Sequence, residues 1–370
     1  MTISNDLYAT RLTIDLDVVR DNYRLLQDTL GKTKAGAAVK ADGYGLGSRY
    51  VVRALWAAGC RDFFVAHPHE GVVVRDELPD AIIHVLNGPL PNAVDDYLDA
   101  GLRPVLNSLG DIALWQAAAK ARNQSLKADV HLDTGMCRLG LDLTETTRLL
   151  DDPDTLLDGI DVGLVMSHLA SADDIDSDQS ANQRTLFKST FDRLGRGTGS
   201  FANSSGIFLG ADYHFELARP GIALYGGNPT PYTENPMRNP VTMDARILQV
   251  RDVAPPEKVG YGASHIVERP SRIATVPIGY ADGFLRAGSS VGMAHIEGHP
   301  APIAGRVSMD LITLDVTDVP AYLAKPGAIA EFMGKHRTPD DLARDWQTIP
   351  YEVLTGLGQR YARTYKGTGA

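Results

Sequence analysis

The sequence predicts an α/β protein in which an N-terminal (β/α)8 TIM-type barrel is followed by a C-terminal β-rich domain. Over the first two-thirds of the chain, short apolar runs alternate with longer amphipathic stretches, and such alternation of strand and helix indicates a parallel sheet. Eight apolar runs, spaced roughly 20 to 35 residues apart, match the βα units of a closed barrel. After an Asn-, Pro- and Thr-rich stretch at residues 228–236, apolar runs follow one another with little helix between them.

Each barrel strand is expected at an apolar run, with amphipathic helices in between. The strands are predicted over residues 35–39, 63–66, 81–86, 104–106, 128–132, 162–166, 201–203 and 215–218. The helices are predicted over residues 16–30, 49–58, 92–100, 112–121 and 183–194. Beyond the linker, strands are predicted over residues 245–250, 272–278, 292–296, 303–307 and 311–316, and a short helix over residues 339–346. We therefore divide the chain into a barrel domain, residues 1–234, whose first ten or so residues are free to pack on the second domain, and a β-rich domain, residues 235–370.

The composition fits a globular enzyme from a reducing compartment. A net charge of −10 argues against nucleic acid or an anionic membrane as a partner. Two cysteines, Cys60 and Cys137, are too few for a disulfide framework. The N-terminus lacks the basic start and apolar core of a signal peptide, and no run approaches the roughly 18 apolar residues of a membrane span. We expect a cytoplasmic protein.

A polar or charged residue closes every one of the eight apolar runs. In order these residues are Lys40, His67, Asn87, Asn107, Arg138, His168, Asn203 with Ser204, and Arg219. The carboxyl ends of barrel strands are where active sites collect, so the set suggests a ring of functional groups on one face. Lys40 stands between an apolar run and a glycine-rich turn, where an amine loses its proton more easily and becomes a nucleophile. The alternative is a strand-end lysine that simply reaches into water.

Six segments of the chain resemble the alanine racemase family. They are residues 39–45, 133–140, 219–226, 260–262, 277–283 and 305–310. The resemblance spans about residues 10–365, with the segments in order and at matching separations. It implies a pyridoxal-phosphate enzyme built from an N-terminal barrel and a C-terminal β-domain.

The resemblance implies two catalytic bases. Lys40 would hold the cofactor covalently and, once freed by substrate, act as a base on one face of the α-carbon. Inversion needs a second acid/base on the opposite face, and Tyr261 matches that position. A phenol has a reference pKa of about 10, so it needs nearby cations to work at neutral pH. Tyr261 and Met309 would both come from the other subunit, which implies a homodimer with shared active sites.

The resemblance also implies the residues around the cofactor and the substrate. Arg219 would face the pyridine nitrogen and stay protonated, with a pKa above about 12, and His168 would hydrogen-bond near it. The phosphate group would be held by Ser204, the amides of Gly221 and Ile222, the hydroxyl of Tyr44, and Asn203. Arg138 would bind the cofactor's phenolic oxygen and, with Met309, the substrate carboxylate. The access corridor, or alternatively a merely solvated rim, would consist of Asp173, Tyr280, Arg286 and Arg306.

Two positions depart from the family pattern. Many relatives carry a carbamate-bearing lysine where this chain has His131, so Arg138 must be braced in another way. Many also carry a tyrosine at the position of Gln359, which leaves the substrate range open. No metal site is expected, because a strand end and a helix start explain the string His67-Pro68-His69-Glu70 better. Cys137 is expected to be a buried thiol.

We expect an alanine racemase with pyridoxal phosphate as its cofactor and a small amino acid as its substrate. The first alternative is a broader amino-acid racemase that includes serine. A decarboxylase of the same barrel type usually carries a cysteine in the loop that crosses the interface, and this chain has none beyond residue 137. A non-catalytic pyridoxal-phosphate carrier would resemble the barrel alone.

Overall fold

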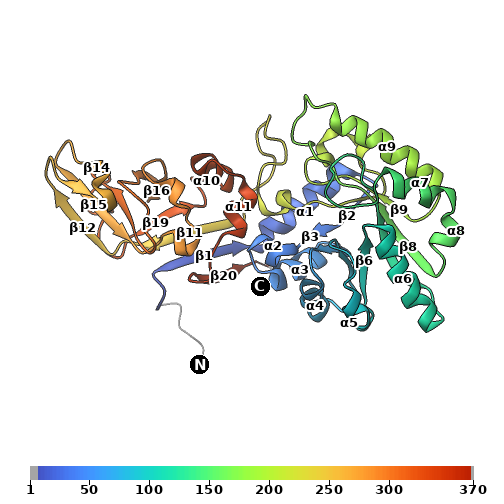
Figure 1. Cartoon of the computed structure of the whole chain (residues 1–370). Helices are drawn as coiled ribbons and strands as arrows, with labels where there is room; N and C mark the ends of the chain where they lie inside the picture. The colour runs from blue at the N-terminus through green and yellow to red at the C-terminus, as the bar shows by residue number, and fades with distance from the viewer. Residues whose placement is uncertain (1–6, 368–370) are drawn as a thin grey trace.

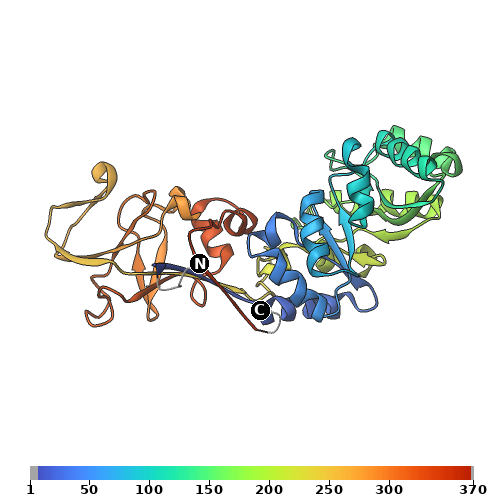
Figure 2. The same cartoon turned by 90° about the horizontal axis from the view of Figure 1, so that it is seen from below.

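The computed structural model describes residues 7–367 as a barrel and an elongated β-rich part that lie end to end (Figure 1 and Figure 2). The predicted fold class, a (β/α)8 barrel followed by a β-rich domain, is confirmed. Within the described residues, no helix is both long and apolar enough to cross a membrane.

Eight strand positions close the barrel. The strands are β2 (Lys34–Ala35) continued by β3 (Ala37–Ala38), β4 (Asp62–Val65), β5 (Ile82–Val85), β6 (Leu102–Leu106), β7 (Leu126–His131), β8 (Ile160–Met166), β9 (Thr198–Ser200) and β10 (Leu217–Ala218). Strands β3 to β9 pair in parallel in sequence order, and β10 pairs with β2. The remaining gap is closed by backbone hydrogen bonds from Glu216 to Gly199 and from Arg219 to Ala202. Gly36 lies between β2 and β3, at a position where a Cβ would meet the Phe64 ring at 2.8 Å.

Helices cover the outside of the barrel. They are α1 (Leu16–Leu30), α3 (Ser48–Ala57), α4 (Pro68–Glu77), α5 (Val94–Asp99), α6 (Leu109–Arg122), α7 (Leu143–Asp151), the short α8 (Pro153–Leu156) and α9 (Gln179–Leu194). Helix α1 has the bounds that the sequence predicts. The Asp15 side chain accepts hydrogen bonds from the amides of Asp17 and Val18 at its start, and Gly31 ends it.

The largest sheet of the second part includes a strand from the N-terminus. Its order is β17 (His299–Pro302), β16 (Met293–Ile296), β19 (Ile329–Met333), β11 (Val241–Arg246), β1 (Thr10–Asp15) and β20 (Ala362–Lys366). Strand β1 runs antiparallel to β11 and parallel to β20. The expectation that the first ten or so residues pack on this domain falls partly on residues 1–6, which lie outside the described residues. The division at residues 234 and 235 stays a proposal.

A smaller sheet and a hairpin complete the second part. The sheet has the order β12 (Gln249–Val253), β15 (Ser271–Val276) and β18 (Ile312–Asp315), and the hairpin pairs β13 (Lys258–Val259) with β14 (His265–Ile266). Figure 1 shows that β14 lies at the end of the molecule farthest from the barrel.

Three predicted strands are wrong. Residues 201–203 follow β9 rather than form it, and residues 303–307 follow β17. Residues 245–250 straddle the end of β11 and the start of β12. The side chains of Phe201, Ala202, Ile303 and Val307 are buried without lying in strands. Apolar composition therefore marked burial correctly at these places but could not distinguish a strand from a buried loop.

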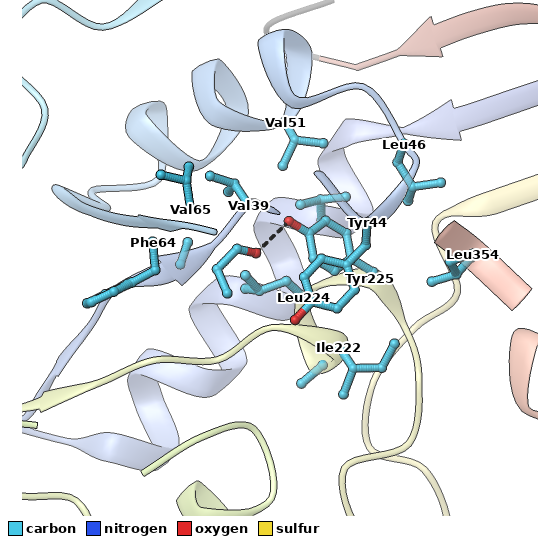
Figure 3. Packing of buried hydrophobic residues seen from close by; sticks show 14 of the residues in the cluster. Val39, Tyr44, Leu46, Val51, Phe64, Val65, Ile222, Leu224, Tyr225 and Leu354 are labelled. Carbon is cyan, nitrogen blue, oxygen red and sulfur yellow. Dashed lines mark hydrogen bonds between the residues drawn. The ribbon is translucent and has the colours of Figure 1, made fainter. Parts of the chain in front are cut away.

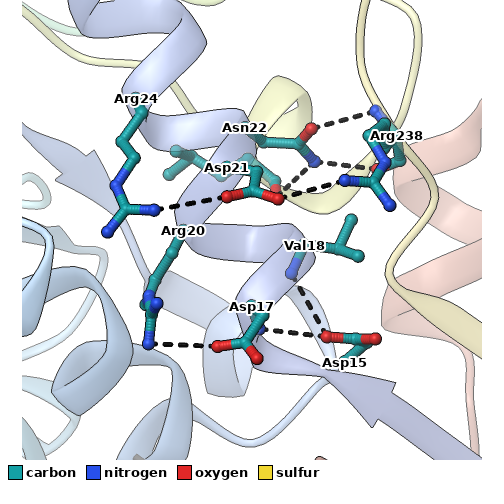
Figure 4. A network of polar contacts seen from close by, with 9 residues as sticks. Asp15, Asp17, Val18, Arg20, Asp21, Asn22, Arg24 and Arg238 are labelled. Carbon is teal, nitrogen blue, oxygen red and sulfur yellow. Dashed lines mark hydrogen bonds and ion pairs between the residues drawn. The ribbon is translucent and has the colours of Figure 1, made fainter. Parts of the chain in front are cut away.

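Polar contacts on α1 hold the segment that joins the two parts. Asn22 donates to the carbonyls of Arg238 (2.8 Å) and Leu224 (3.2 Å), and it accepts from the Arg238 amide (2.9 Å). The Arg238 guanidinium also pairs with Asp21 on the same helix (Figure 4). Because Asn22 is buried, these bonds fix where the chain leaves the barrel.

Two helices from the second part lie between its sheet and the barrel. They are α10 (Pro339–Trp346), whose predicted bounds are confirmed, and α11 (Pro350–Thr355). Asp340 in α10 accepts from the amide of Asn228, at the end of the barrel. Helix α11 lies beside α2 (Lys40–Tyr44), the segment that follows β3 (Figure 1).

Candidate active site

One cavity of about 300 Å³ lies at the carboxyl ends of the barrel strands. All nine residues that we expected to hold a cofactor line it: Lys40, Tyr44, Arg138, His168, Asn203, Ser204, Arg219, Gly221 and Ile222. They come from segments spread over about half of the chain. The parallel barrel brings them together because its strands all end on one face.

Lys40 enters the cavity directly after β3. Burial lowers the pKa of its amine, and the positive charge of Arg138 lowers it further. Glu70 raises this pKa and Arg219 lowers it. The pKa remains below the ordinary lysine value, so a larger fraction of the amine is unprotonated and nucleophilic at neutral pH.

A buried arginine forms the floor of the cavity. Arg219 donates to the hydroxyl of Ser200 (2.7 Å) and the carbonyl of Ser167 (2.5 Å), and its Nη2 lies 3.5 Å from Nδ1 of His168. Burial lowers the pKa of Arg219 to about 10, while Asp129 opposes this change. The guanidinium therefore still carries its charge at neutral pH.

His168 is neutral in this environment. Burial holds the pKa of its imidazole well below the ordinary value, and Arg219, Arg138 and Lys40 add to that effect. A neutral imidazole can accept a hydrogen bond at Nδ1, which is the atom that faces the guanidinium of Arg219.

Hydroxyl groups and backbone amides gather at one end of the cavity. The Ser204 hydroxyl accepts from the amides of Gly221 (2.9 Å) and Ala223 (3.3 Å). A Cβ on Gly221 would lie 2.1 Å from the Tyr44 hydroxyl, so glycine is required for this close approach. The Tyr44 ring stacks on Tyr225 at 4.6 Å (Figure 3). The hydroxyls of Ser204 and Tyr44 can donate hydrogen bonds to an oxyanion.

Hydrogen bonds of Asn203 and Tyr225 fix the backbone at this end of the cavity. The Asn203 side chain accepts from the amide of Gly206 (2.9 Å), which fixes the turn after Ser204. The Tyr225 hydroxyl donates to the carbonyl of Ala38 (2.9 Å), two residues before Lys40. The turn that carries Ser204 and the strand that leads to Lys40 are both anchored by buried hydrogen bonds.

Sequence reasoning missed the two polar residues that α11 adds to the lining, Tyr351 and Thr355. The Tyr351 ring lies 6.0 Å from that of Tyr44. Burial raises the pKa of Tyr351 to about 12, and the nearby carboxylate of Asp173 adds to this effect. No local pattern could have found these residues, because only the packing of α11 against the barrel brings them to the cavity. Asp173, an expected corridor residue, is close enough to Tyr351 to act on its pKa, although it does not line the cavity.

The loop that carries Arg138 is braced by a carboxylate rather than by His131. Asp133 accepts from the amides of Gly135, Met136 and Cys137 at 2.9, 2.9 and 3.1 Å. His131 instead bonds Asn107 through Nδ1 (2.8 Å), and burial, with Arg219, lowers its pKa to about 4. Cys137 is exposed, so the expectation of a buried thiol is wrong.

The other expected site residues lie in the β-rich part. Tyr261 follows β13, and 72% of its surface is exposed, while 53% of Met309 is exposed. The loop 305–310, which carries Met309, lies beside Gly262, since a Cβ on Gly262 would be 2.9 Å from Arg306 Nη1. In the same loop, the Met309 carbonyl accepts from the amide of Ala281.

Three further positions that the sequence singles out, Tyr280, Arg286 and Gln359, do not line the Lys40 cavity. Tyr280 and Arg286 follow β15 in the same β-rich part. Gln359 lines a neighbouring cavity of about 440 Å³, together with Asp42 and Arg363.

The chemistry of the cavity fits pyridoxal phosphate. Its lining includes three basic side chains, those of Lys40, Arg138 and Arg219, and no carboxylate. The hydroxyls of Ser204 and Tyr44 suit a phosphate, and the Lys40 amine suits an aldehyde. Fold and site together define a barrel enzyme with a reactive lysine and a β-rich partner domain.

The chain belongs to the alanine racemase family. Residues 14–229 match the family's N-terminal domain and residues 240–365 its C-terminal domain. The chain is 50% identical to an alanine racemase of Rhodospirillum rubrum over 365 residues, or 98% of this chain and 97% of that protein. It is 46% identical to a catabolic alanine racemase of Agrobacterium fabrum over 355 residues, covering 96% and 91% of the two chains.

Solved structures show the same similarity. A crystal structure of alanine racemase from Bartonella henselae, with covalently bound pyridoxal phosphate, has a TM-score of 0.93 and 39% identity. The match covers 97% of this chain and 99% of that one. Biosynthetic alanine racemase from Pseudomonas aeruginosa has a TM-score of 0.89 and 33% identity, with 97% and 100% covered.

Proposed function

We propose that this chain interconverts L- and D-alanine with pyridoxal phosphate held at Lys40, and that Tyr261 of the partner subunit supplies the second base. The observation that carries the two-subunit arrangement is the exposure of Tyr261 on a hairpin remote from the barrel of its own chain (Figure 1). From there Tyr261 cannot reach the Lys40 cavity of its own chain. A homodimer in which each hairpin reaches the other barrel would complete both sites.

The cofactor, when bound, supplies a conjugated ring that withdraws electrons from the substrate α-carbon and so acidifies its proton. The lowered pKa of Lys40 leaves its amine free to accept that proton on one face. The phenol of Tyr261 of the partner subunit donates a proton on the opposite face, and the reverse reaction exchanges the two roles. The hand of the α-carbon changes because the proton leaves on one side and returns on the other.

Arg219 would face the ring nitrogen and donate a hydrogen bond to it. Since the pKa of Arg219 is about 10, the guanidinium keeps its proton at neutral pH. An unprotonated ring is a weaker electron sink, which favours quick return of a proton to the α-carbon over other outcomes. His168, Ser204, Tyr44, Asn203 and the backbone at Gly221 and Ile222 would hold the rest of the cofactor.

The substrate would be held from both subunits. Arg138 would bind its carboxylate with help from Met309 of the partner subunit. Asp173, with Tyr280, Arg286 and Arg306 of the partner subunit, would line the path to the cavity. The boundary proposed at residues 234 and 235 falls in the interval between the two family matches.

The D-alanine that forms would supply peptidoglycan precursors in the cytoplasm. The alternative is breakdown of D-alanine, since relatives named biosynthetic and catabolic both resemble the chain.

A panel of single L-amino acids, incubated with enzyme and cofactor and resolved by chiral chromatography, tests the proposal. We expect D-alanine to form fastest, with none formed by Lys40→Ala. Serine converted as fast as alanine would favour the broader racemase. A protein that binds cofactor and inverts no amino acid would be a carrier, and the proposal would fail.

A further inference from the structure

The backbone that follows Lys40 has an unusual conformation. Ala41, Asp42, Gly43 and Tyr44 all have positive φ values, between 53° and 63°. This left-handed conformation is unfavourable for every residue other than glycine. Three of the four residues are not glycine, so the surrounding structure must hold the turn in place.

Glu70, at the start of α4, bonds to the residue that follows Lys40. Its Oε1 accepts from the amide of Ala41 at 2.6 Å. Its Oε2 accepts from the amides of Ala66 and His67 at 2.8 and 3.0 Å. One carboxylate therefore joins the turn after β3 to the loop between β4 and α4.

The bond to Ala41 acts on Lys40 itself. The Ala41 amide belongs to the peptide unit that begins at the Lys40 carbonyl, so holding this plane fixes the backbone of Lys40 and the direction of its side chain. The far side of the turn has a different anchor, because Asp42 accepts from the amide (2.8 Å) and hydroxyl (3.1 Å) of Ser48. Among the hydrogen bonds of the described residues, the one from Ala41 to Glu70 is the one in which a side chain holds the near side of the turn.

Glu70 also acts on Lys40 through its charge. The charged groups that affect the Lys40 amine are Arg138, Arg219 and Glu70. The fourth titratable neighbour, His168, is neutral. Glu70 is the carboxylate that opposes the two arginines, and losing it would lower the pKa of Lys40 further.

We propose that Glu70 is a positioning residue for Lys40: its carboxylate clamps the Lys40–Ala41 peptide to the start of α4 and partly offsets the two arginines at the amine. The inference rests on the proposed function only in taking Lys40 as the residue that captures the cofactor. The helix-start reading of the string His67-Pro68-His69-Glu70 agrees with the structure, since α4 begins at Pro68.

The test measures Lys40 rather than racemisation. Protein freed of cofactor is mixed with pyridoxal phosphate at a series of pH values, reduced with borohydride, and the label at Lys40 is counted by peptide mass spectrometry. The pH midpoint of the labelling rate reports the amine's protonation, and the rate at high pH reports its placement.

We expect Glu70→Gln to lower the midpoint by about half a unit to one unit, because a negative charge is lost. The high-pH rate should fall about tenfold, because a glutamine cannot accept on both of its terminal atoms. Glu70→Asp keeps the charge but is one methylene shorter. It should slow the high-pH rate and leave the midpoint near the wild-type value, which separates reach from charge.

Glu77→Gln is the matched control. Glu77 ends the same helix, and its carboxylate pairs with Arg49 and Arg53 on the surface. Both measured values should stay at wild type in this variant. A Glu70→Gln protein that unfolds no more readily than the control, yet labels at the wild-type rate or with the wild-type midpoint, overturns the inference. Wild-type protein that does not label at Lys40 would instead overturn the proposed function.

Discussion

The imidazole of His84 and the carboxylate of Asp129 form a fully buried pair, with Nδ1 and Oδ2 2.5 Å apart. On its other side, Nε2 of His84 lies 3.2 Å from Asp62. The His84 ring stacks at 4.4 Å on Phe64, and Phe64 lines the Lys40 cavity. Asp129 also raises the pKa of Arg219. A charged network thus lies one aromatic ring below the cavity.

This network predicts that stability depends on pH through His84. Burial lowers the pKa of His84, but Asp129 and Asp62 raise it more, so the net shift is upward. The stabilisation is fully present below the unfolded imidazole pKa of about 6.5 and is lost as pH rises through the higher folded value. Near pH 6, His84→Gln should lower the free energy of unfolding by about 3 kcal/mol or more.

Urea unfolding at several pH values measures the His84 effect. The difference between wild type and His84→Gln should shrink steadily as pH rises above about 6.5. His299→Gln, at an exposed histidine on β17, serves as the control and should show no such trend. A difference that stays constant with pH would mean that the pKa of His84 does not change on folding.

Gly221→Ala should weaken cofactor binding without unfolding the barrel. The new methyl group would collide with the Tyr44 hydroxyl, because a Cβ there would lie 2.1 Å from it. Overpacking of this kind costs about 1–3 kcal/mol, which corresponds to about a tenfold rise in Kd for each 1.4 kcal/mol. A fluorescence titration with pyridoxal phosphate measures Kd. Gly110→Ala, where the nearest atom is 3.4 Å away, should leave it unchanged.

Tyr261→Phe should lower the rate of racemisation by about 10²- to 10⁴-fold, the usual range for a lost acid/base group. Cofactor binding should change little, because the substitution leaves intact the residues that line the Lys40 cavity. In D2O, one alanine enantiomer should still exchange its α-proton through Lys40. Tyr322→Phe, at another exposed tyrosine of the β-rich part, is the matched control. A racemisation rate equal to that of the control would remove Tyr261 from the reaction.

Mixing inactive subunits tests whether the sites are shared. In a heterodimer of Lys40→Ala and Tyr261→Phe chains, one of the two sites has both bases intact. Random exchange makes half of the dimers heterodimers, so activity should recover to about one quarter of wild type. Native mass spectrometry must confirm that heterodimers form. If they form without any recovered activity, the bases do not come from different subunits.

Local signals allowed correct prediction where they were complete. The bounds of α1 follow from the Asp15 cap, the periodic apolar residues and Gly31. The positions of Lys40 and Arg219 follow from the rule that polar residues close barrel strands. Each of these features is encoded within a few residues of the position concerned.

Signals that depend on tertiary packing could not be read from the sequence. Tyr351 reaches the cavity only because α11 packs beside α2, more than 300 residues away in the chain. Glu70 bonds to Ala41 across two barrel segments, and no local pattern links them. The sequence predicts a strand over residues 201–203 instead of β9 at Thr198–Ser200, because Phe201 and Ala202 are buried like strand residues. Burial in the finished fold, rather than propensity, decided these cases.

The place of β1 between β11 and β20 sets the order in which the protein can be completed. Its two neighbours begin at Val241 and Ala362, so a strand that is made before the barrel is paired on both edges only after the barrel and most of the β-rich part have been made. A fragment that begins after the barrel would lack this inner strand of its sheet. The two parts are therefore interlocked, and a gene split between them would yield pieces that need each other to fold.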